Sequence, residues 1–396
     1  MKINSNTSIN LNQSTTDIST KNITRLINGG KIPAPKEIMA YLNERVIGQE
    51  DAKKRLSVAV HNHYKRVFSN LCGLGNDSEF SDVEIDKSNI LMLGNTGTGK
   101  TFLIQNIAKM LGVPCHIHDC TKLTEAGYVG EDVENILTGL LMACDYDIER
   151  AQVGIVCLDE IDKLAKKGEN MSIVRDVSGE GVQQSLLKIV EGSVVGVMPQ
   201  GGRKHPEQPL IPVDTTNILF IGMGAFVGME DIIKKRMTAT TTIGFNQSSV
   251  KRMDIKENKI LDYTNGVDLK KFGIIPELIG RFPVITHTNP LTKDDLVRII
   301  REPKNSIMRQ YQKLAYIDGK RLIFTDDAID LIAETAILSE TGARGIRSIL
   351  ETVLNDFMYD VSDCEGTEMV IDKEYCEKSL KDLIEFANTY ITKKAV

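Results

Sequence analysis

The sequence lacks the long apolar runs that a membrane protein needs. None of its 396 residues lies in a run approaching the roughly 18 consecutive apolar residues that cross a bilayer, and the N-terminus has no apolar segment of the secretory kind. An excess of basic charge is also missing, since the formal net charge is −6, whereas dedicated nucleic-acid binders usually carry a basic domain or stripe. We therefore expect a soluble, cytoplasmic protein that binds neither membrane nor nucleic acid.

Cysteine pairs of the Cys-x-x-Cys type are absent as well. The seven cysteines are scattered, which fits reduced thiols in a cytosol better than a disulfide framework. The tract from Cys115 to Cys120 contains two histidines between its cysteines, but in an extended chain residues 116, 118 and 120 face one side and Cys115 the other. We therefore predict no zinc site.

Composition and periodicity divide the chain into three parts. Residues 1–32 are rich in Ser, Thr and Asn and are typical of a flexible tail, whose few acidic residues leave an organelle matrix as an alternative location. Short apolar runs at 89–93, 154–158 and 217–221 then alternate with helical patterns, which predicts a parallel sheet covered on both faces.

A polar stretch containing Pro290 marks the next boundary, because apolar residues at helical spacing, such as Leu296, Ile299 and Ile300, dominate the chain after it. We predict a large domain at 33–288 and a small domain at 289–396.

A phosphate-binding loop directly follows the first apolar run. It has the pattern Gly-x-x-x-x-Gly-Lys-Thr and is followed by a helical stripe, which is the context that this motif requires. Glycines let backbone N–H groups approach phosphate oxygens, the lysine reaches the β- and γ-phosphates, and the threonine hydroxyl binds Mg²⁺. The predicted nucleotide-binding residues are Gly94, Asn95, Thr96, Gly97, Thr98, Gly99, Lys100 and Thr101.

Two acidic residues end the second apolar run. We expect Asp159 to hold Mg²⁺, directly or through water, and Glu160 to polarise the attacking water as a general base. Small GTPases lack such a glutamate and carry a guanine-reading Asn-Lys-x-Asp motif that is absent here. The sequence therefore favours ATP with Mg²⁺ as its cofactors.

With these residues in view, the chain resembles the ClpX family of AAA+ ATPases from about Pro33 to Ile371. The resemblance implies an α/β fold: an AAA+ P-loop NTPase large domain with a parallel sheet between helices, followed by a smaller, mainly helical α+β domain. It further implies an ATP-dependent unfoldase that works as a homo-hexamer, binds protein substrates with exposed terminal tags and threads them through a ring pore into a ClpP-type peptidase.

Further segments carry the resemblance and imply roles for their residues. Val46-Ile47-Gly48-Gln49 is similar to the segment that lays apolar side chains, here Val46 and Ile47, against adenine. The remaining similar segments are the first pore loop with Tyr128 and Val129, the second pore loop with Arg175, and the basic pore entrance with Arg203, Lys204 and His205.

The tripeptide Ile243-Gly244-Phe245 resembles the loop by which ClpX proteins dock into apolar clefts on the peptidase. Exposing two such side chains costs about 1.5 to 3 kcal/mol each unless something covers them, so a loop tucked into this chain is the alternative. Two arginines complete the resemblance: Arg281 matches the finger that reaches a neighbouring subunit's ATP, and Arg344 matches the small-domain residue that contacts nucleotide.

The chain also departs from the family. No cysteine precedes Cys72, so we expect no N-terminal zinc-binding domain of the kind that the family carries, and any adaptor is unidentified. Asn95 replaces a common proline, and Gly222-Met223-Gly224 stands where many AAA+ proteins place a polar water-sensing residue, which leaves that residue unassigned.

A remodelling chaperone that works without a peptidase is the alternative function. The acidic net charge and Tyr128-Val129 disfavour a DNA motor, the intact catalytic set disfavours an inactive scaffold, and the related HslU family lacks the docking tripeptide.

Overall fold

The computed structural model describes residues 31–72, 79–124, 130–166, 179–199, 209–239, 257–339, 341–361 and 367–394. The chain forms two compact units. Among the described residues, the first consists of 31–40, 50–95 and 100–288, and the second of 41–49, 96–99 and 289–394.

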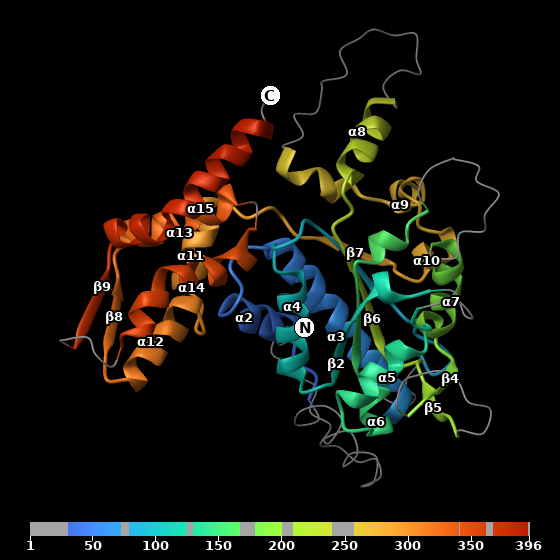
Figure 1. Ribbon diagram of the computed structural model, residues 1–396. Coiled ribbons are helices and arrows are strands. Elements are labelled where there is room, and N and C mark those ends of the chain that lie inside the picture. The colour runs from blue at the N-terminus through green and yellow to red at the C-terminus, as the bar shows by residue number, and fades with distance from the viewer. Residues whose placement is uncertain are drawn as a thin grey trace, which may run out of the picture. The chain divides into compact units, whose positions relative to one another are not determined.

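A parallel sheet forms the centre of the first unit (Figure 1). Its five strands among the described residues run in the order β2-β3-β6-β1-β7, and every pairing is parallel. The strands are β1 (Ile90–Leu93), β2 (Cys115–Asp119), β3 (Ile155–Asp159), β6 (Leu219–Gly224) and β7 (Val284–His287). The three predicted apolar runs are thus β1, β3 and β6.

Helices α2 (Pro35–Asn43) and α3 (Glu50–Cys72) precede the first strand, and the other helices of this unit lie between strands, because parallel neighbours need crossover connections. These other helices are α4 (Lys100–Leu111), α5 (Asn135–Met142), α6 (Ile148–Ala151), α7 (Glu180–Glu191), α8 (Met229–Ala239), α9 (Gly266–Phe272) and α10 (Pro276–Gly280). Short 3₁₀ helices occur at η2 (Cys120–Lys122), η3 (Ile161–Leu164) and η4 (Glu257–Tyr263), and an antiparallel hairpin joins β4 (Val194–Val197) to β5 (Ile211–Asp214).

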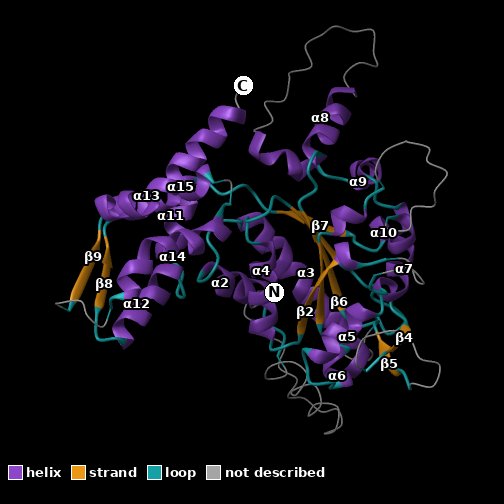
Figure 2. Ribbon diagram, viewed as in Figure 1, coloured by secondary structure: helices purple, strands orange, loops and turns teal. Residues whose placement is uncertain are grey.

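Both faces of the sheet are covered. Leu91 and Leu93 of β1 share one apolar cluster with side chains of α5 and α7, whereas α3 and α4 lie on the other face (Figure 2). The alternate residues Ile90 and Met92 are fully buried as well, as expected for a parallel sheet between two helical layers. This arrangement confirms the predicted α/β fold with a parallel sheet between helices.

The second unit is mainly helical and has its own apolar core. It contains α11 (Lys293–Arg301), α12 (Ile307–Ile317), α13 (Asp326–Leu338), α14 (Ala343–Tyr359) and α15 (Lys373–Lys394), with a two-stranded parallel sheet of β8 (Arg321–Phe324) and β9 (Glu368–Ile371). Thr292 begins α11 with a reciprocal capping box to Asp295, which ends the preceding irregular stretch.

Two short segments that the sequence analysis assigned to the large domain group instead with the second unit: Tyr41–Gln49 and Thr96–Gly99. Hydrogen bonds explain the grouping of the first. The Gln49 side chain donates to Asn289 O (2.8 Å) and accepts from Asn289 N (2.7 Å), and Lys304 N donates to Glu44 O (3.1 Å). Such long-range contacts leave no local signal in the sequence.

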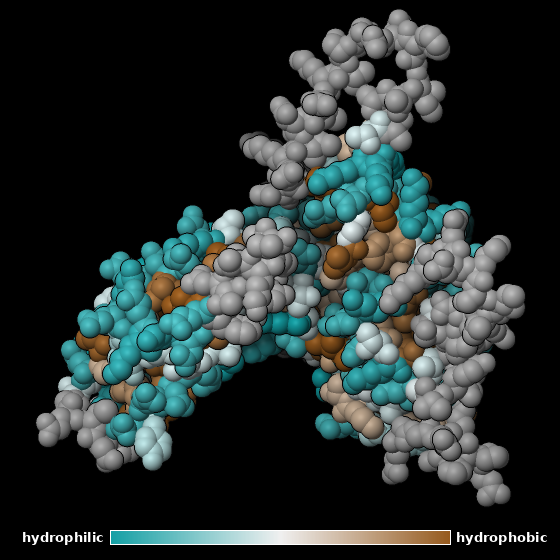
Figure 3. Space-filling model, turned by 45° about the horizontal axis from the view of Figure 1, so that its top comes forward, coloured by the Kyte–Doolittle hydropathy of each residue, from teal (hydrophilic) through white to brown (hydrophobic). Residues whose placement is uncertain are grey.

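The face drawn in Figure 3 is largely hydrophilic and carries separate apolar patches. Within the described residues, none of the helices combines the length and apolar character that crossing a bilayer demands.

Candidate nucleotide site

Strand order brings the two predicted phosphate-site elements to one edge of the sheet. The phosphate loop follows β1, and Asp159 ends β3, with β6 between these two strands. Because all three strands are parallel, their carboxyl ends meet at the same edge, where open α/β sheets bind ligands.

Three glycines give the phosphate loop its path. Gly94, Gly97 and Gly99 have φ values of +143°, +83° and +92°, which side-chain-bearing residues rarely adopt. Gly94 is also crowded, because a Cβ there would lie 2.1 Å from Thr288 Oγ1. Its N–H donates to Gly224 O (3.1 Å), which ties the loop to β6. The loop therefore tolerates no side chain at Gly94.

Lys100 concentrates positive charge over this loop. It begins α4, and its ammonium folds back to donate to Gly94 O (2.6 Å) and Asn95 O (3.0 Å). Asn95 and Thr96 are exposed, Thr98 is buried, and Thr101 is half-buried beside Lys100 at the start of α4. The helix N-terminus, the backbone and the ammonium together suit a polyphosphate.

The acidic pair at the end of β3 has a strained backbone. Glu160 has φ +56° in the left-handed region, and its N–H donates to Asp159 Oδ1 at 3.0 Å. A non-glycine residue in this conformation costs of order 1 to 3 kcal/mol and is often found at functional sites. Since the Glu160 side chain is exposed and Asp159 is half-buried, the turn presents Glu160 to solvent at the phosphate edge.

Sequence reasoning missed a third carboxylate at this edge. Asp162 in η3 is 7% exposed, and its Oδ2 accepts from Phe226 N (3.2 Å), while its Oδ1 is buried without a partner among the described residues. A Cβ at Gly224 would lie 2.4 Å from that Oδ1, so glycine at the end of β6 makes room for the carboxylate. The sequence signal that could have identified it is an acidic residue two positions after Glu160.

Arg281 lies at the opposite edge of the sheet. Its carbonyl accepts from Asn89 Nδ2 (2.9 Å) just before β1, and β7 begins three residues after it, with Val284 paired to Ile90. The guanidinium contacts Glu191 Oε1 through Nε (2.9 Å) and Nη2 (2.8 Å). A four-residue strand spans about 13 Å, so Arg281 is remote from the phosphate loop of its own chain.

The second unit holds the other described candidates. Val46 and Ile47 are each 7% exposed, and Arg344 is exposed in the first turn of α14. The sequence indicated no separate role for Gln49. Besides its bonds to Asn289 it donates to Thr98 O (3.4 Å), with its own backbone at φ +60°.

Several predicted residues lie outside the described residues: Tyr128, Val129, Arg175, Arg203, Lys204, His205, Ile243, Gly244 and Phe245. The first pair sits between described flanks that meet, since Thr124 N donates to Glu131 O (3.1 Å) and Glu131 N donates to Lys122 O (3.0 Å).

The Cys115–Cys120 tract forms β2 and η2. Burial lowers the pKa of His116 to about 4 and also lowers the pKa of His118, so both imidazoles are neutral at pH 7. Among the described residues, no group of three or more His, Cys, Asp or Glu side chains is arranged to hold a metal ion.

Known proteins match both units. Residues 85–285 match the AAA domain (Cdc48 subfamily), and residues 291–362 match the C-terminal, D2-small domain, of ClpB protein. Relatives named ATP-dependent Clp protease ATP-binding subunit ClpX include one from Porphyromonas gingivalis, 53% identical over 88% of this chain and 83% of its own length. Others come from Bacteroides thetaiotaomicron (52%; 90% and 84%) and Borrelia duttonii (53%; 86% and 77%). The chain therefore belongs to the ClpX family and is an AAA+ ATPase.

Proposed function

We propose that this ATPase is a protein unfoldase and translocase that assembles as a homo-hexamer and delivers protein substrates to a ClpP-type peptidase. The proposal joins the geometry of the nucleotide site to the roles that the family implies for the remaining residues.

The residues at the carboxyl edge of the sheet fit ATP with Mg²⁺. Lys100 would bind the β- and γ-phosphates, and Thr101 with Asp159 would hold the ion, whose charge helps the γ-phosphoryl group to leave. The buried Oδ1 of Asp162, unpaired among the described residues, adds acceptor capacity at the same edge. Glu160, exposed on its strained turn, would accept a proton from the attacking water.

The position of Arg281 carries the inference of assembly. This guanidinium lies with Glu191 at the amino edge of the sheet, while the phosphate loop lies at the carboxyl edge. If Arg281 stabilises charge on a γ-phosphate, that phosphate must therefore belong to a neighbouring subunit, which makes hydrolysis depend on the ring. Arg344 on α14 would contact the nucleotide, so that the second unit responds to ATP hydrolysis.

Substrate handling falls to the loops. We propose that Tyr128 and Val129 grip the polypeptide by contact area rather than by sequence, with Arg175 beside them in the pore. Arg203, Lys204 and His205 would attract the carboxylate terminus of a tagged substrate. Ile243-Gly244-Phe245 would dock into apolar clefts of the peptidase, which distinguishes this function from remodelling without a peptidase.

The test is ATP-dependent loss of native fluorescence from a stably folded, degron-tagged fluorescent protein, with and without a ClpP-type peptidase. We expect fluorescence to fall with ATP, and the substrate to be degraded only when the peptidase is present. Glu160→Gln should bind ATP but leave the substrate folded. ATP hydrolysis that leaves several tags and folds intact would contradict the proposal, and unfolding without any effect of the peptidase would favour the remodelling chaperone.

A further inference from the structure

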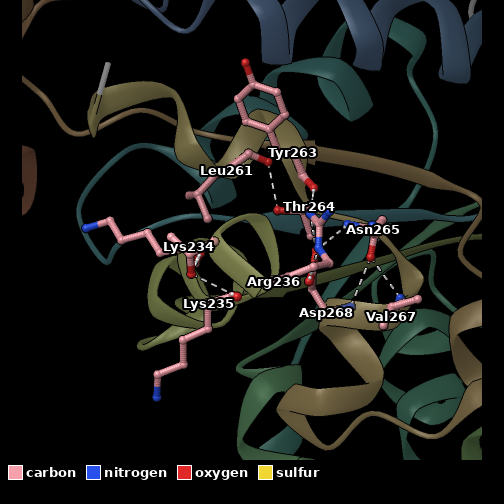
Figure 4. A network of polar contacts seen from close by, with 10 residues as sticks. Lys234, Lys235, Arg236, Leu261, Tyr263, Thr264, Asn265, Val267 and Asp268 are labelled. Atoms are coloured by element: carbon pink, nitrogen blue, oxygen red, sulfur yellow. Dashed lines mark hydrogen bonds and ion pairs between the residues drawn. The ribbon is translucent and has the colours of Figure 1, made fainter. Parts of the chain in front are cut away.

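An ion pair with a buried carboxylate joins two stretches of chain that flank the predicted docking tripeptide. Arg236 lies on α8, which ends at Ala239, and Asp268 lies on α9, shortly after η4 begins at Glu257. Residues 243–245 fall between these elements in the sequence. Figure 4 shows the two side chains facing each other, with the backbone of Tyr263 close by.

The pair is bidentate and its acidic member is fully buried. Arg236 Nε donates to Asp268 Oδ1 (2.7 Å) and Nη2 donates to Oδ2 (3.0 Å), while the Asp268 side chain is 0% exposed. Arg236 Nη2 also donates to Tyr263 O (2.7 Å) at the end of η4. One guanidinium on α8 therefore holds both the end of η4 and the start of α9.

Asp268 is itself anchored by the local backbone. It forms a capping box with Asn265: Asp268 Oδ2 accepts from Asn265 N (3.1 Å), and Asn265 Oδ1 accepts from Asp268 N (3.1 Å). The carboxylate thus has partners from α8 and from its own helix start, which is the condition under which a buried charge is tolerated.

Apolar packing alone would leave the orientation of these elements loosely set. Ile233 of α8, Ile260 of η4 and Leu269 of α9 belong to one buried cluster, but hydrophobic contact is not directional. A two-point guanidinium–carboxylate contact is directional, because it fixes the planes of both groups. The ion pair therefore sets the angle and spacing at which the chain leaves α8 and returns through η4.

We propose that Arg236 and Asp268 are positioning residues for partner docking, and that they fix the relative orientation of α8 and η4, the two stems that flank residues 240–256 in the sequence. This inference rests on the proposed function, in which Ile243-Gly244-Phe245 binds the peptidase. Without the pair, the stems must be ordered during binding, and that ordering cost weakens the complex.

The experiment titrates Asp268→Asn and Arg236→Lys against a fixed amount of ClpP-type peptidase and follows the ATP-dependent cleavage of an unfolded, tagged substrate. We expect Asp268→Asn to raise the concentration for half-maximal cleavage roughly tenfold. Arg236→Lys should raise it less, because it keeps the charge but loses the fork. ATPase activity without peptidase should stay within about twofold. The reason is distance: α8 begins after the end of β6 at the phosphate edge, and Arg236 lies roughly 10 Å further along the helix.

Lys234→Gln is the matched control. Lys234 is an exposed cation on the same helix, and its side chain points away from the pair. Hydrogen exchange provides a readout independent of the peptidase: peptides from α8 and η4 should exchange faster in Asp268→Asn and not in Lys234→Gln.

The outcomes separate the inference from the function on which it rests. A wild-type protein that neither binds nor feeds the peptidase overturns the proposed function and this inference with it. If the wild type docks but Asp268→Asn docks as tightly as Lys234→Gln, the inference alone is wrong. If ATPase activity and docking fall by the same factor, the pair has only a general folding role and the inference is again overturned.

Discussion

His63 should make the first unit lose stability as pH falls. It lies on α3, is 3% exposed, and its Nε2–H donates to Asn217 O (3.2 Å). Two cations reach the neighbouring carbonyls, with Lys87 Nζ 2.7 Å from Thr215 O and Arg66 Nη2 2.8 Å from Thr216 O. Burial, followed by the charges of Arg66 and Lys87, lowers the pKa of His63 from 6.5 to about 3.

The direction and size of the effect follow from linkage. Below pH 6.5 the unfolded chain binds a proton at this histidine and the folded chain does not, so the stability present above pH 6.5 is lost progressively toward pH 3. At a pH of about 5.5 the unfolded state gains about 1.4 kcal/mol from this proton, and at about 7.5 it gains almost none. The size of this destabilisation requires only that the pKa of His63 in the folded state lie well below 5.5.

Urea unfolding of the nucleotide-free protein, followed by circular dichroism at these two pH values, measures the loss. His63→Gln keeps an N–H donor for Asn217 O but cannot titrate, so its loss on acidification should be smaller than that of the wild type by about 1.4 kcal/mol. His61→Gln, two residues earlier on α3 at a less buried position whose pKa burial also lowers, should reduce the loss by less than His63→Gln does. Equal losses in the wild type and His63→Gln would refute the assignment.

Four further substitutions test the nucleotide site. Gly94→Ala should abolish binding of a fluorescent ATP analogue, because its Cβ would overlap Thr288 Oγ1; measurable affinity would contradict the crowding. Gly224→Ala should displace the Asp162 carboxylate and lower the ATPase kcat about tenfold or more while nucleotide affinity changes little; an unchanged kcat would remove Asp162 from the site. Glu191→Gln should change the free energy of unfolding by less than about 0.5 kcal/mol, because the ion pair is exposed. Its ATPase activity should persist, whereas Arg281→Lys should lower hydrolysis about a hundredfold or more; equal effects of the two would contradict the finger.

The fold class and the core of the nucleotide site could be predicted from the sequence because their signals are local. A buried strand followed by glycines and Lys100, and another ending in Asp159 and Glu160, specify both motifs within a few residues each. Parallel pairing then brings the motifs to one edge without further information.

Other features depend on contacts between residues far apart in the chain, and no local pattern encodes those. Gly224 approaches Asp162 from 62 positions away, and Gln49 binds Asn289 across 240. The edge at which Arg281 lies follows from β7 pairing beside β1, which the order of motifs along the chain does not fix.

The unassigned polar residue at the end of β6 illustrates how such a contact changes an interpretation. In the sequence, Gly222-Met223-Gly224 looked like the loss of a polar side chain. In the fold, β6 separates the strand before the phosphate loop from the strand that ends in Asp159, so position 224 lies beside both elements. Glycine there leaves space that the Asp162 carboxylate fills from η3, with Phe226 N as its partner. A polar side chain therefore does reach the end of β6, from the turn after β3, and the glycine is what admits it.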